Sequence, residues 1–126
     1  MEKYTATLKG GQEIYVPAWP ASVALENLTK AGKYVGSDNL INIAELNIPS
    51  AMLAIMNSED SATTAELVKH FVCEARMDGE KIMKSDYDNK FQGDIYLAIE
   101  LFCHVVRAQY YDFFVQGLAK ETSPED

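Results

Sequence analysis

Hydrophobic residues recur every three or four positions along residues 91–118, and this spacing predicts one long helix. One line of apolar side chains follows one helix face, and a second line follows a neighbouring face. A helix that is apolar over so much of its circumference must be covered on more than one side. We expect the chain to be built around this helix, with another molecule as a candidate for part of its cover. The first line is Phe91, Ile95, Ile99, Phe102, Val106, Tyr110, Phe113 and Phe114, and the second is Leu97, Leu101, Val105 and Ala108.

Two short stretches of alternating character open the chain at residues 4–8 and 12–16. Gly10 and Gly11 lie between them and supply the positive φ angles that a tight turn needs. The pattern predicts a β-hairpin, and Pro17 ends its second strand because proline has no amide hydrogen to donate. A free edge of such a hairpin is a template for a strand of a second copy or of a partner.

The middle of the chain predicts shorter helices separated by glycine, proline and polar breaks. One apolar stretch, LINIAEL, fits either a short strand or a helical turn, because its length does not decide between them. The polar stretch before the long helix is expected to form a loop. The predicted helices cover residues 20–30, 51–57 and 62–77, the ambiguous stretch covers residues 40–46, and the loop covers residues 80–89.

These elements predict a mainly α fold: a small bundle of four to five helices with a short N-terminal β-hairpin and a long C-terminal helix. A chain of 126 residues is long enough to bury a core without disulfides or metals. We therefore expect a single domain over residues 1–126. It would consist of the hairpin at 1–17, a helical body at 18–118 and a flexible polar tail at 119–126.

Trp19 stands where the predicted second strand ends and the first helix is about to begin. A hydrophobic residue just before a helix often packs against that helix and fixes the angle at which the chain enters it. An exposed contact with a ligand is the alternative for a tryptophan beside two prolines. We expect the packing role, with Trp19 held against the first helix.

The chain carries 19 acidic and 11 basic residues, which gives a formal net charge of -8 at pH 7. A nucleic-acid backbone would be repelled by this charge, so we expect no nucleic-acid partner. No apolar run approaches the roughly 20 residues that span a bilayer, and the first ten residues lack the features of a signal peptide. We expect a soluble intracellular protein with no membrane partner, whose two cysteines stay reduced.

Four residues of types that zinc accepts occur as His70-x-x-Cys73 and Cys103-His104. Adjacent helical residues diverge by about 100°, so Cys103 and His104 could not easily point at one ion. We prefer two core thiols and two partly exposed histidines, with no metal and no cofactor. His70 and Cys73 as a base and nucleophile are equally unsupported, because nothing nearby suggests an oxyanion hole.

Asp86, Asp88 and Asp94 could also be read as a cluster of oxygen ligands for calcium. The stretch DYDNKFQGD lacks the glycine and the distal glutamate of an EF-hand loop. A solvated loop, with Asp94 near the positive N-terminal end of the long helix, explains the same residues without a cation. The common catalytic motifs are also missing, so we expect no enzyme and propose no catalytic residue.

The long helix ends in the aromatic sequence QYYDFF, residues 109–114. These aromatics are spread around the helix, so they cannot all face one core. Because aromatic side chains dominate binding hot spots, we expect some of them to contact a partner. The alternative is that a neighbouring helix covers them all; the two readings differ at Tyr111 and Phe114. The candidate contacts are Phe102, Tyr110, Tyr111, Phe113 and Phe114.

Several stretches resemble the tail assembly chaperones of long-tailed bacteriophages. They are the opening YTATLKGGQEIYVPAW, the helix SVALENLTKAG, and the loop and helix DYDNKFQGDIYLAIELFCHVVRAQYYDFF. The resemblance implies a non-enzymatic chaperone that binds the tape measure protein, keeps it soluble and helps recruit tail tube subunits. It also implies a homo-oligomer that works in the host cell cytoplasm and is missing from the mature virion. The alternative is a small tail completion or connector protein that stays in the virion.

Overall fold

The computed structural model of the protein describes residues 4–122, and its side chains as far as residue 117. The fold is mainly helical, with a small antiparallel sheet and a long C-terminal helix, which confirms the predicted fold class. The elements are β1 (Tyr4–Thr7), β2 (Glu13–Val16), α1 (Ala21–Val35), α2 (Ser37–Ala44), α3 (Ile48–Met56), α4 (Ser61–Val72), β3 (Arg76–Met77), β4 (Glu80–Lys81), the 3-10 turn η1 (Lys84–Asp86), α5 (Tyr87–Lys90) and α6 (Ile95–Thr122).

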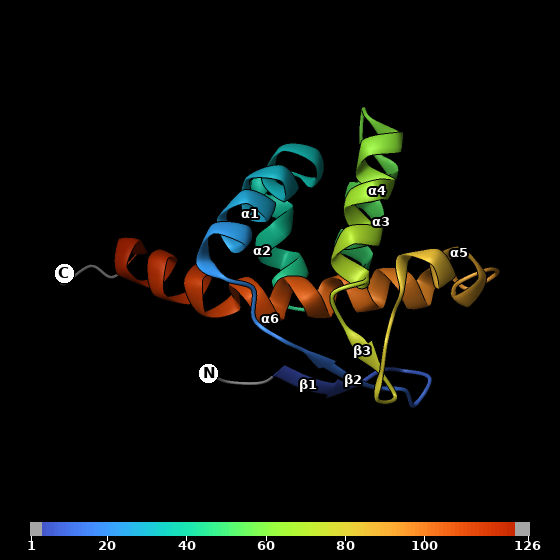
Figure 1. The fold of residues 1–126 in the computed structure, drawn as a ribbon. Coiled ribbons are helices and arrows are strands. Elements are labelled where there is room, and N and C mark those ends of the chain that lie inside the picture. Colours follow the sequence, from blue (N-terminus) through green and yellow to red (C-terminus); the bar gives the residue numbers. More distant parts are fainter. Residues whose placement is uncertain (1–3, 123–126) are drawn as a thin grey trace.

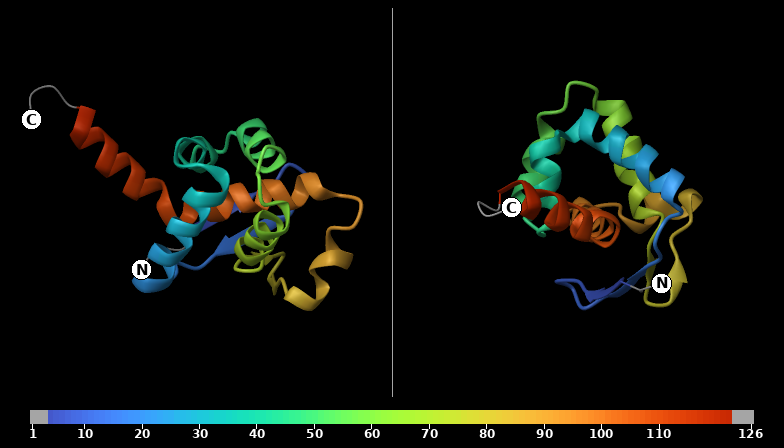
Figure 2. Two further views of the ribbon diagram at one scale, coloured as in Figure 1. Left: turned by 90° about the horizontal axis from the view of Figure 1, so that it is seen from above. Right: turned by 90° about the vertical axis from the view of Figure 1, so that its left-hand side faces the viewer.

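Helix α6 runs through the middle of the molecule, with α1 to α4 on one side and the sheet on the other (Figure 1). The end-on view in Figure 2 shows the same arrangement, with the helices arched over α6 and the sheet beneath it. The predicted cover on more than one side is therefore confirmed, and for the middle of α6 the chain itself supplies it. The buried residues of α6 are Leu97, Ala98, Glu100, Leu101, Phe102, Cys103, His104, Val105, Val106 and Tyr110.

The predicted hairpin is confirmed. Strands β1 and β2 pair antiparallel, with Tyr4 opposite Val16 and Thr7 opposite Glu13. Gly11 has a φ angle of 94°, so a glycine is required at this turn. The sheet continues in the order β1-β2-β3-β4, and β1 forms one of its two edges.

Strands β3 and β4 correct the prediction of a helix over residues 62–77. Helix α4 ends at Val72, and the chain then pairs with β2, because the Asp78 amide donates to the Glu13 carbonyl at 2.7 Å. The Asp78 carboxylate accepts from the Glu13 amide at 3.0 Å, so two hydrogen bonds join these residues. Asp78 and Gly79 have positive φ angles of 52° and 85°, so they form the turn between β3 and β4.

Most other helix boundaries differ from the prediction by a few residues. Helix α1 continues through Gly32 to Val35, and Pro20 rather than Ser22 occupies its cap position. The ambiguous stretch at residues 40–46 is helical, because α2 covers most of it. The loop expected at residues 80–89 contains β4, η1 and α5.

The long helix begins at Ile95, later than the predicted start at Phe91. Gly93 has a φ angle of 77°, which a helix cannot contain, and the Asp94 carboxylate then accepts a hydrogen bond from the Leu97 amide at 3.2 Å. The helix continues beyond Leu118 to Thr122, so it includes the first half of the expected tail. Residues 123–126 of that tail lie outside the described residues.

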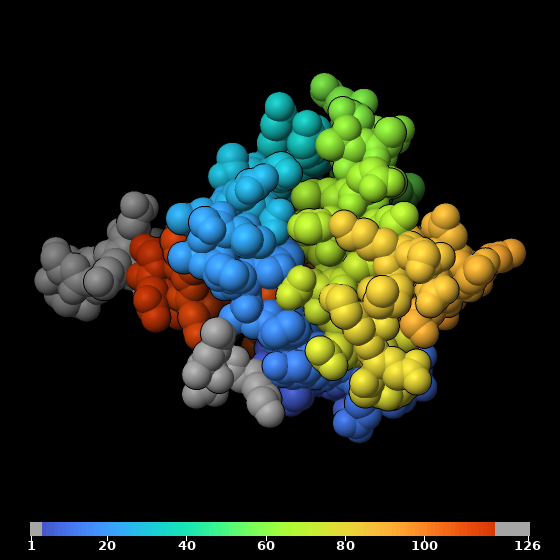
Figure 3. Space-filling view, in the orientation of Figure 1, coloured from blue at the N-terminus to red at the C-terminus, as the bar shows by residue number. Residues whose placement is uncertain are grey.

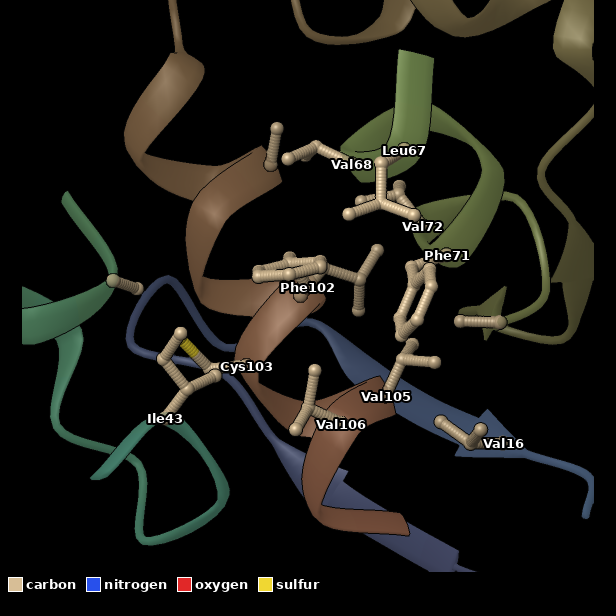
Figure 4. Close-up of a cluster of buried hydrophobic side chains, with 14 of the residues drawn as sticks. Val16, Ile43, Leu67, Val68, Phe71, Val72, Phe102, Cys103, Val105 and Val106 are labelled. Atoms are coloured by element: carbon tan, nitrogen blue, oxygen red, sulfur yellow. The ribbon is translucent and has the colours of Figure 1, made fainter. Parts of the chain in front are cut away.

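Contact between α4 and α6 forms one major part of the core (Figure 4). Phe71 and Phe102 are both fully buried, and their ring centroids lie 5.3 Å apart. The Trp19 ring meets Phe71 edge-on at 5.0 Å and stacks on His70 at 6.0 Å. Trp19 is therefore buried, as the packing role requires, and its aromatic partners lie in α4 and, at Tyr110, in α6.

Replacement of Phe102 by alanine should lower the free energy of unfolding by about 3–5 kcal/mol, because it leaves a cavity between α6 and α4. Urea denaturation followed by circular dichroism measures this loss. Phe113→Ala on the same helix is the matched control; its ring is exposed, so we expect a change within about 0.5 kcal/mol. Equal losses for the two variants would show that the α4–α6 contact does not stabilise the core.

Candidate partner-binding surface

The C-terminal turns of α6 project beyond the body of the molecule (Figure 2). We call residues 111–117 the α6 tip. The exposed fractions of Phe113 and Val115 are 56% and 47%, which are high values for apolar side chains. Asp112, Gln116 and Gly117 are exposed as well. The α6 tip therefore presents apolar side chains to solvent on a projecting helix, a pattern typical of a binding surface.

Two of the five candidate contacts belong to the core instead. Phe102 is fully buried, and Tyr110 is 97% buried with its hydroxyl donating to the Ala24 carbonyl at 2.7 Å. Burial raises the pKa of the Tyr110 phenol. A partner that docks on the surface cannot touch either ring, because the chain has already covered both.

The other three candidates lie in the α6 tip and reach solvent to different degrees. The Tyr111 ring is half-buried beneath the Arg107 guanidinium, which lies 4.1 Å from the ring centroid. Phe114 is half-buried against Tyr110, at 6.3 Å between ring centroids. The centroid of the Phe113 ring lies 5.5 Å from that of Phe114, and Phe113 is exposed. These three residues form an aromatic surface next to the buried Tyr110, with Phe113 exposed and the other two half-buried.

Two polar side chains of α6, Glu100 and His104, hold the hairpin in place. Glu100 was not among the predicted functional residues, and His104 is buried, whereas we expected it to be partly exposed. The Glu100 carboxylate accepts from the Lys9 amide at 2.8 Å. The hydroxyl of Tyr4 and His104 Nδ1 lie 2.7 Å apart. Glu100 and His104 are buried and four residues apart, on one helix face. In the sequence, the sign of this role is a pair of polar residues four positions apart within an otherwise apolar stretch of helix.

Gln109 fastens the linker between the hairpin and α1. Its side-chain oxygen accepts from the Trp19 amide at 2.9 Å, and its side-chain nitrogen donates to the Pro17 carbonyl at 2.8 Å. Both ends of one amide thus bind the backbone on either side of Ala18. The Gln109 bonds fix the entry to α1 beside Tyr110, at the base of the α6 tip.

The histidines and cysteines do not come together. His70 stacks on Trp19, and His104 is bound to Tyr4. Both cysteines are buried and free, and burial raises the pKa of the Cys103 thiol to about 12. In the part of the chain that the structure describes, no three His, Cys, Asp or Glu side chains gather as ligands for a metal ion.

The three aspartates considered as calcium ligands lie in different elements. Asp94 caps α6, while Asp86 and Asp88 are exposed in η1 and α5.

Among the described helices, none is long and apolar enough to cross a membrane.

The sequence profile of the phage tail assembly chaperone proteins, abbreviated TAC, matches residues 10–120. The chain belongs to this family. The match confirms the resemblance seen in the sequence and covers the molecule from the turn of the hairpin into the last turn of α6. No curated protein and no solved structure matches the chain. The family is non-enzymatic, so the surface of this tail assembly chaperone is to be understood through binding rather than through catalysis.

Two motifs of this tail assembly chaperone have distinct structural roles. The FQG sequence at residues 91–93 forms the turn before α6, where Gly93 supplies the positive φ angle. The aromatic sequence at residues 109–114 joins the core at Tyr110 to the exposed α6 tip. The first motif therefore positions the helix, and the second joins the core to the candidate surface.

Acid should destabilise the chaperone through His104. Burial, and then the charge of Arg107, hold the pKa of His104 below its ordinary value of 6.5. The unfolded chain therefore takes up the proton first as pH falls. The stability contributed by neutral His104 is complete above pH 6.5 and is lost as pH falls toward the lower pKa of the folded state.

His104→Gln should therefore reduce the loss of unfolding free energy between about pH 7.5 and about pH 5. Urea denaturation at several pH values measures this slope. His70→Gln is the comparison variant. Burial also lowers the pKa of His70, so this variant should reduce the slope too, but it leaves the contribution of His104 in place. A slope of the wild-type size in His104→Gln would contradict the assignment.

Proposed function

We propose that this chaperone binds the tape measure protein through the α6 tip, keeps it soluble and helps to recruit tail tube subunits. The observation that carries this proposal is the exposure of Phe113 and Val115 on a projecting helix of a tail assembly chaperone. Such a helix can lie against an apolar helix face of a client and remove both apolar surfaces from water. The client would then be shielded where it would otherwise aggregate.

The base of the α6 tip is rigid, which favours binding. Tyr110 is fixed by its hydrogen bond to Ala24, and Gln109 is fixed by both ends of its amide. Aromatic rings held on a packed helix lose little conformational freedom when a partner arrives. Phe113 and Phe114 are therefore well placed as the central contacts, with Tyr111 beside them.

We also propose that several copies bind one client as a homo-oligomer in the host cytoplasm, and that they leave before the virion is complete. Among the described strands, β1 pairs with β2 alone, so its other edge is open to a further strand. A second exposed apolar surface lies on α3, at Met52, Leu53 and Met56. Both surfaces lie apart from the α6 tip in sequence and support contacts between copies.

Co-expression with the tape measure protein tests the proposed function. We expect the tape measure protein to be insoluble when expressed alone, and soluble and co-purified with this chain when the two are made together. If the client stays insoluble and the chain elutes alone, the proposal fails. Mass spectrometry of purified virions then tests retention; detection of the chain in the particle would favour a structural tail component.

Phe113→Asp should reduce co-purification of the tape measure protein at least about tenfold, because it places a charge at the centre of an apolar contact. Tyr111→Asp and Phe114→Asp should weaken binding or self-association in the same direction. Pull-down from the co-expressing cells measures the effect, and circular dichroism checks that helix content is unchanged.

Ile95→Asp is the matched control for the α6 tip. Ile95 lies at the opposite end of the same helix, and 72% of it is exposed, so the change in charge and polarity is the same. We expect Ile95→Asp to bind as the wild type does. Equal losses in the two variants would show that the site is not at the α6 tip.

A further inference from the structure

A groove of about 510 Å³ lies between α1 and α4, away from the α6 tip. A neighbouring hollow of about 430 Å³ shares its residues His70 and Lys84 and extends the groove past β4. Figure 3 shows α1, α4 and the segment after β4 side by side on this face of the molecule. We call the combined feature the lysine groove. The lining residues used here are Asn27, Lys30, Lys33, His70, Lys81 and Lys84.

The charge of the lysine groove is opposite to that of the whole chain. Four lysines line it, against the two carboxylates of Glu66 and Glu74, although the formal net charge of the chain is -8. Within the described residues Lys30 is paired with Glu26 at 3.2 Å, whereas Lys84 has no ion pair. A cluster of positive charge on an acidic protein attracts negative ligands to that one place.

Asn27 provides a second and independent sign of a ligand. Only 3% of this residue is exposed, and its side-chain nitrogen has no hydrogen-bond partner in the described structure. Buried polar groups are nearly always hydrogen-bonded, and one that is not destabilises the folded state. Asn27 lines the lysine groove, so an acceptor that enters the groove comes close to this unpaired amide.

We propose that the lysine groove binds an acidic segment of a protein partner, with carboxylates held by the lysines and an oxygen acceptor placed near Asn27. Leu67 and Tyr34 also line the groove and offer apolar contact to the side chains between those carboxylates. The proposal deepens the proposed function, on which it rests, because the expected partner is an acidic stretch of the tape measure protein.

A peptide fits these observations better than a nucleic acid does. A phosphate backbone carries negative charge along its whole length, so outside the groove it would meet the acidic remainder of this chain. An acidic peptide can confine its charges to the residues inside the groove. The apolar contacts at Leu67 and Tyr34 also suit side chains between acidic residues better than they suit phosphates.

Overlapping synthetic peptides that cover the tape measure protein are the probes for this proposal, each labelled with a fluorophore. We expect acidic peptides to bind in fluorescence anisotropy, and the same peptides with glutamine and asparagine in place of their acidic residues to bind at least about tenfold more weakly. Raising NaCl from about 50 mM to about 500 mM should also weaken the binding, because salt screens charge.

Lys84→Glu should weaken binding of the best acidic peptide about tenfold, because it replaces an unpaired positive charge in the groove with a negative one. Lys90→Glu is the matched control. Lys90 is also an exposed lysine of the segment before α6 and undergoes the same change of charge, but it does not line the groove. Its affinity should stay within about twofold of the wild type. Equal effects in the two variants would overturn the site.

Asn27→Leu separates a binding role from a structural one. Leucine has a similar size and is the better helix former, and it removes the unpaired amide from the interior. We expect the melting temperature to rise while affinity for the acidic peptide falls several-fold. A structural Asn27 would instead give a lower melting temperature. That result, or unchanged affinity with higher stability, would overturn the role given to Asn27.

The inference can fail separately from the proposed function. Co-purification of the tape measure protein that depends on Phe113 and not on Lys84 would leave the chaperone function standing and remove the lysine groove from it. Tighter binding of a single-stranded RNA oligonucleotide than of any acidic peptide would likewise overturn the proposal. Acidic peptides whose affinity depends on both Lys84 and Asn27 support it.

Discussion

Burial of the middle of α6 is the constraint on which the rest of the structure depends. Leu101 and Phe102 are both fully buried, although adjacent residues of a helix point about 100° apart. Each buried side chain of this size contributes about 1.5–3 kcal/mol relative to exposure, so a cover on one side alone would forfeit much of the stabilisation. Helices α1 to α4 cover one side, and the sheet covers the other.

The small sheet cannot hold its place by apolar contact alone, because hydrophobic burial has no direction. A hairpin of two four-residue strands could slide or rotate on the helix while it still covered apolar surface. The hydrogen bond that the Lys9 amide donates to Glu100 and the hydrogen bond between Tyr4 and His104 remove that freedom. Two buried polar residues among apolar ones thus set the register between sheet and helix, and the small strands β3 and β4 can add to a fixed edge.

Much of the fold could be predicted from the sequence because its signals are local. Alternation about Gly10 and Gly11 gives the hairpin, and a sustained helical period gives α6. The pairing of Arg76 with Tyr15 could not be foreseen, since it joins distant segments and overrides a helical pattern. At the candidate surface, the aromatic run could be located, but whether Tyr110 was core or contact depended on the position of α1. The lysine groove was hidden for the same reason, because its lysines come from separate elements.

The two proposed surfaces differ in the chemistry that they can recognise. The α6 tip offers exposed rings and can bind apolar helix faces that differ in sequence, because the free energy of apolar burial depends on area and has no preferred direction. The lysine groove selects by charge and by position, through its lysines and the amide of Asn27. Each surface is small and is expected to bind weakly by itself. When both surfaces bind one client, the overall affinity rises because the second contact forms within the same complex. Under the proposed function the chaperone must release its client again, and contacts that are individually weak favour this release because they can be displaced one at a time.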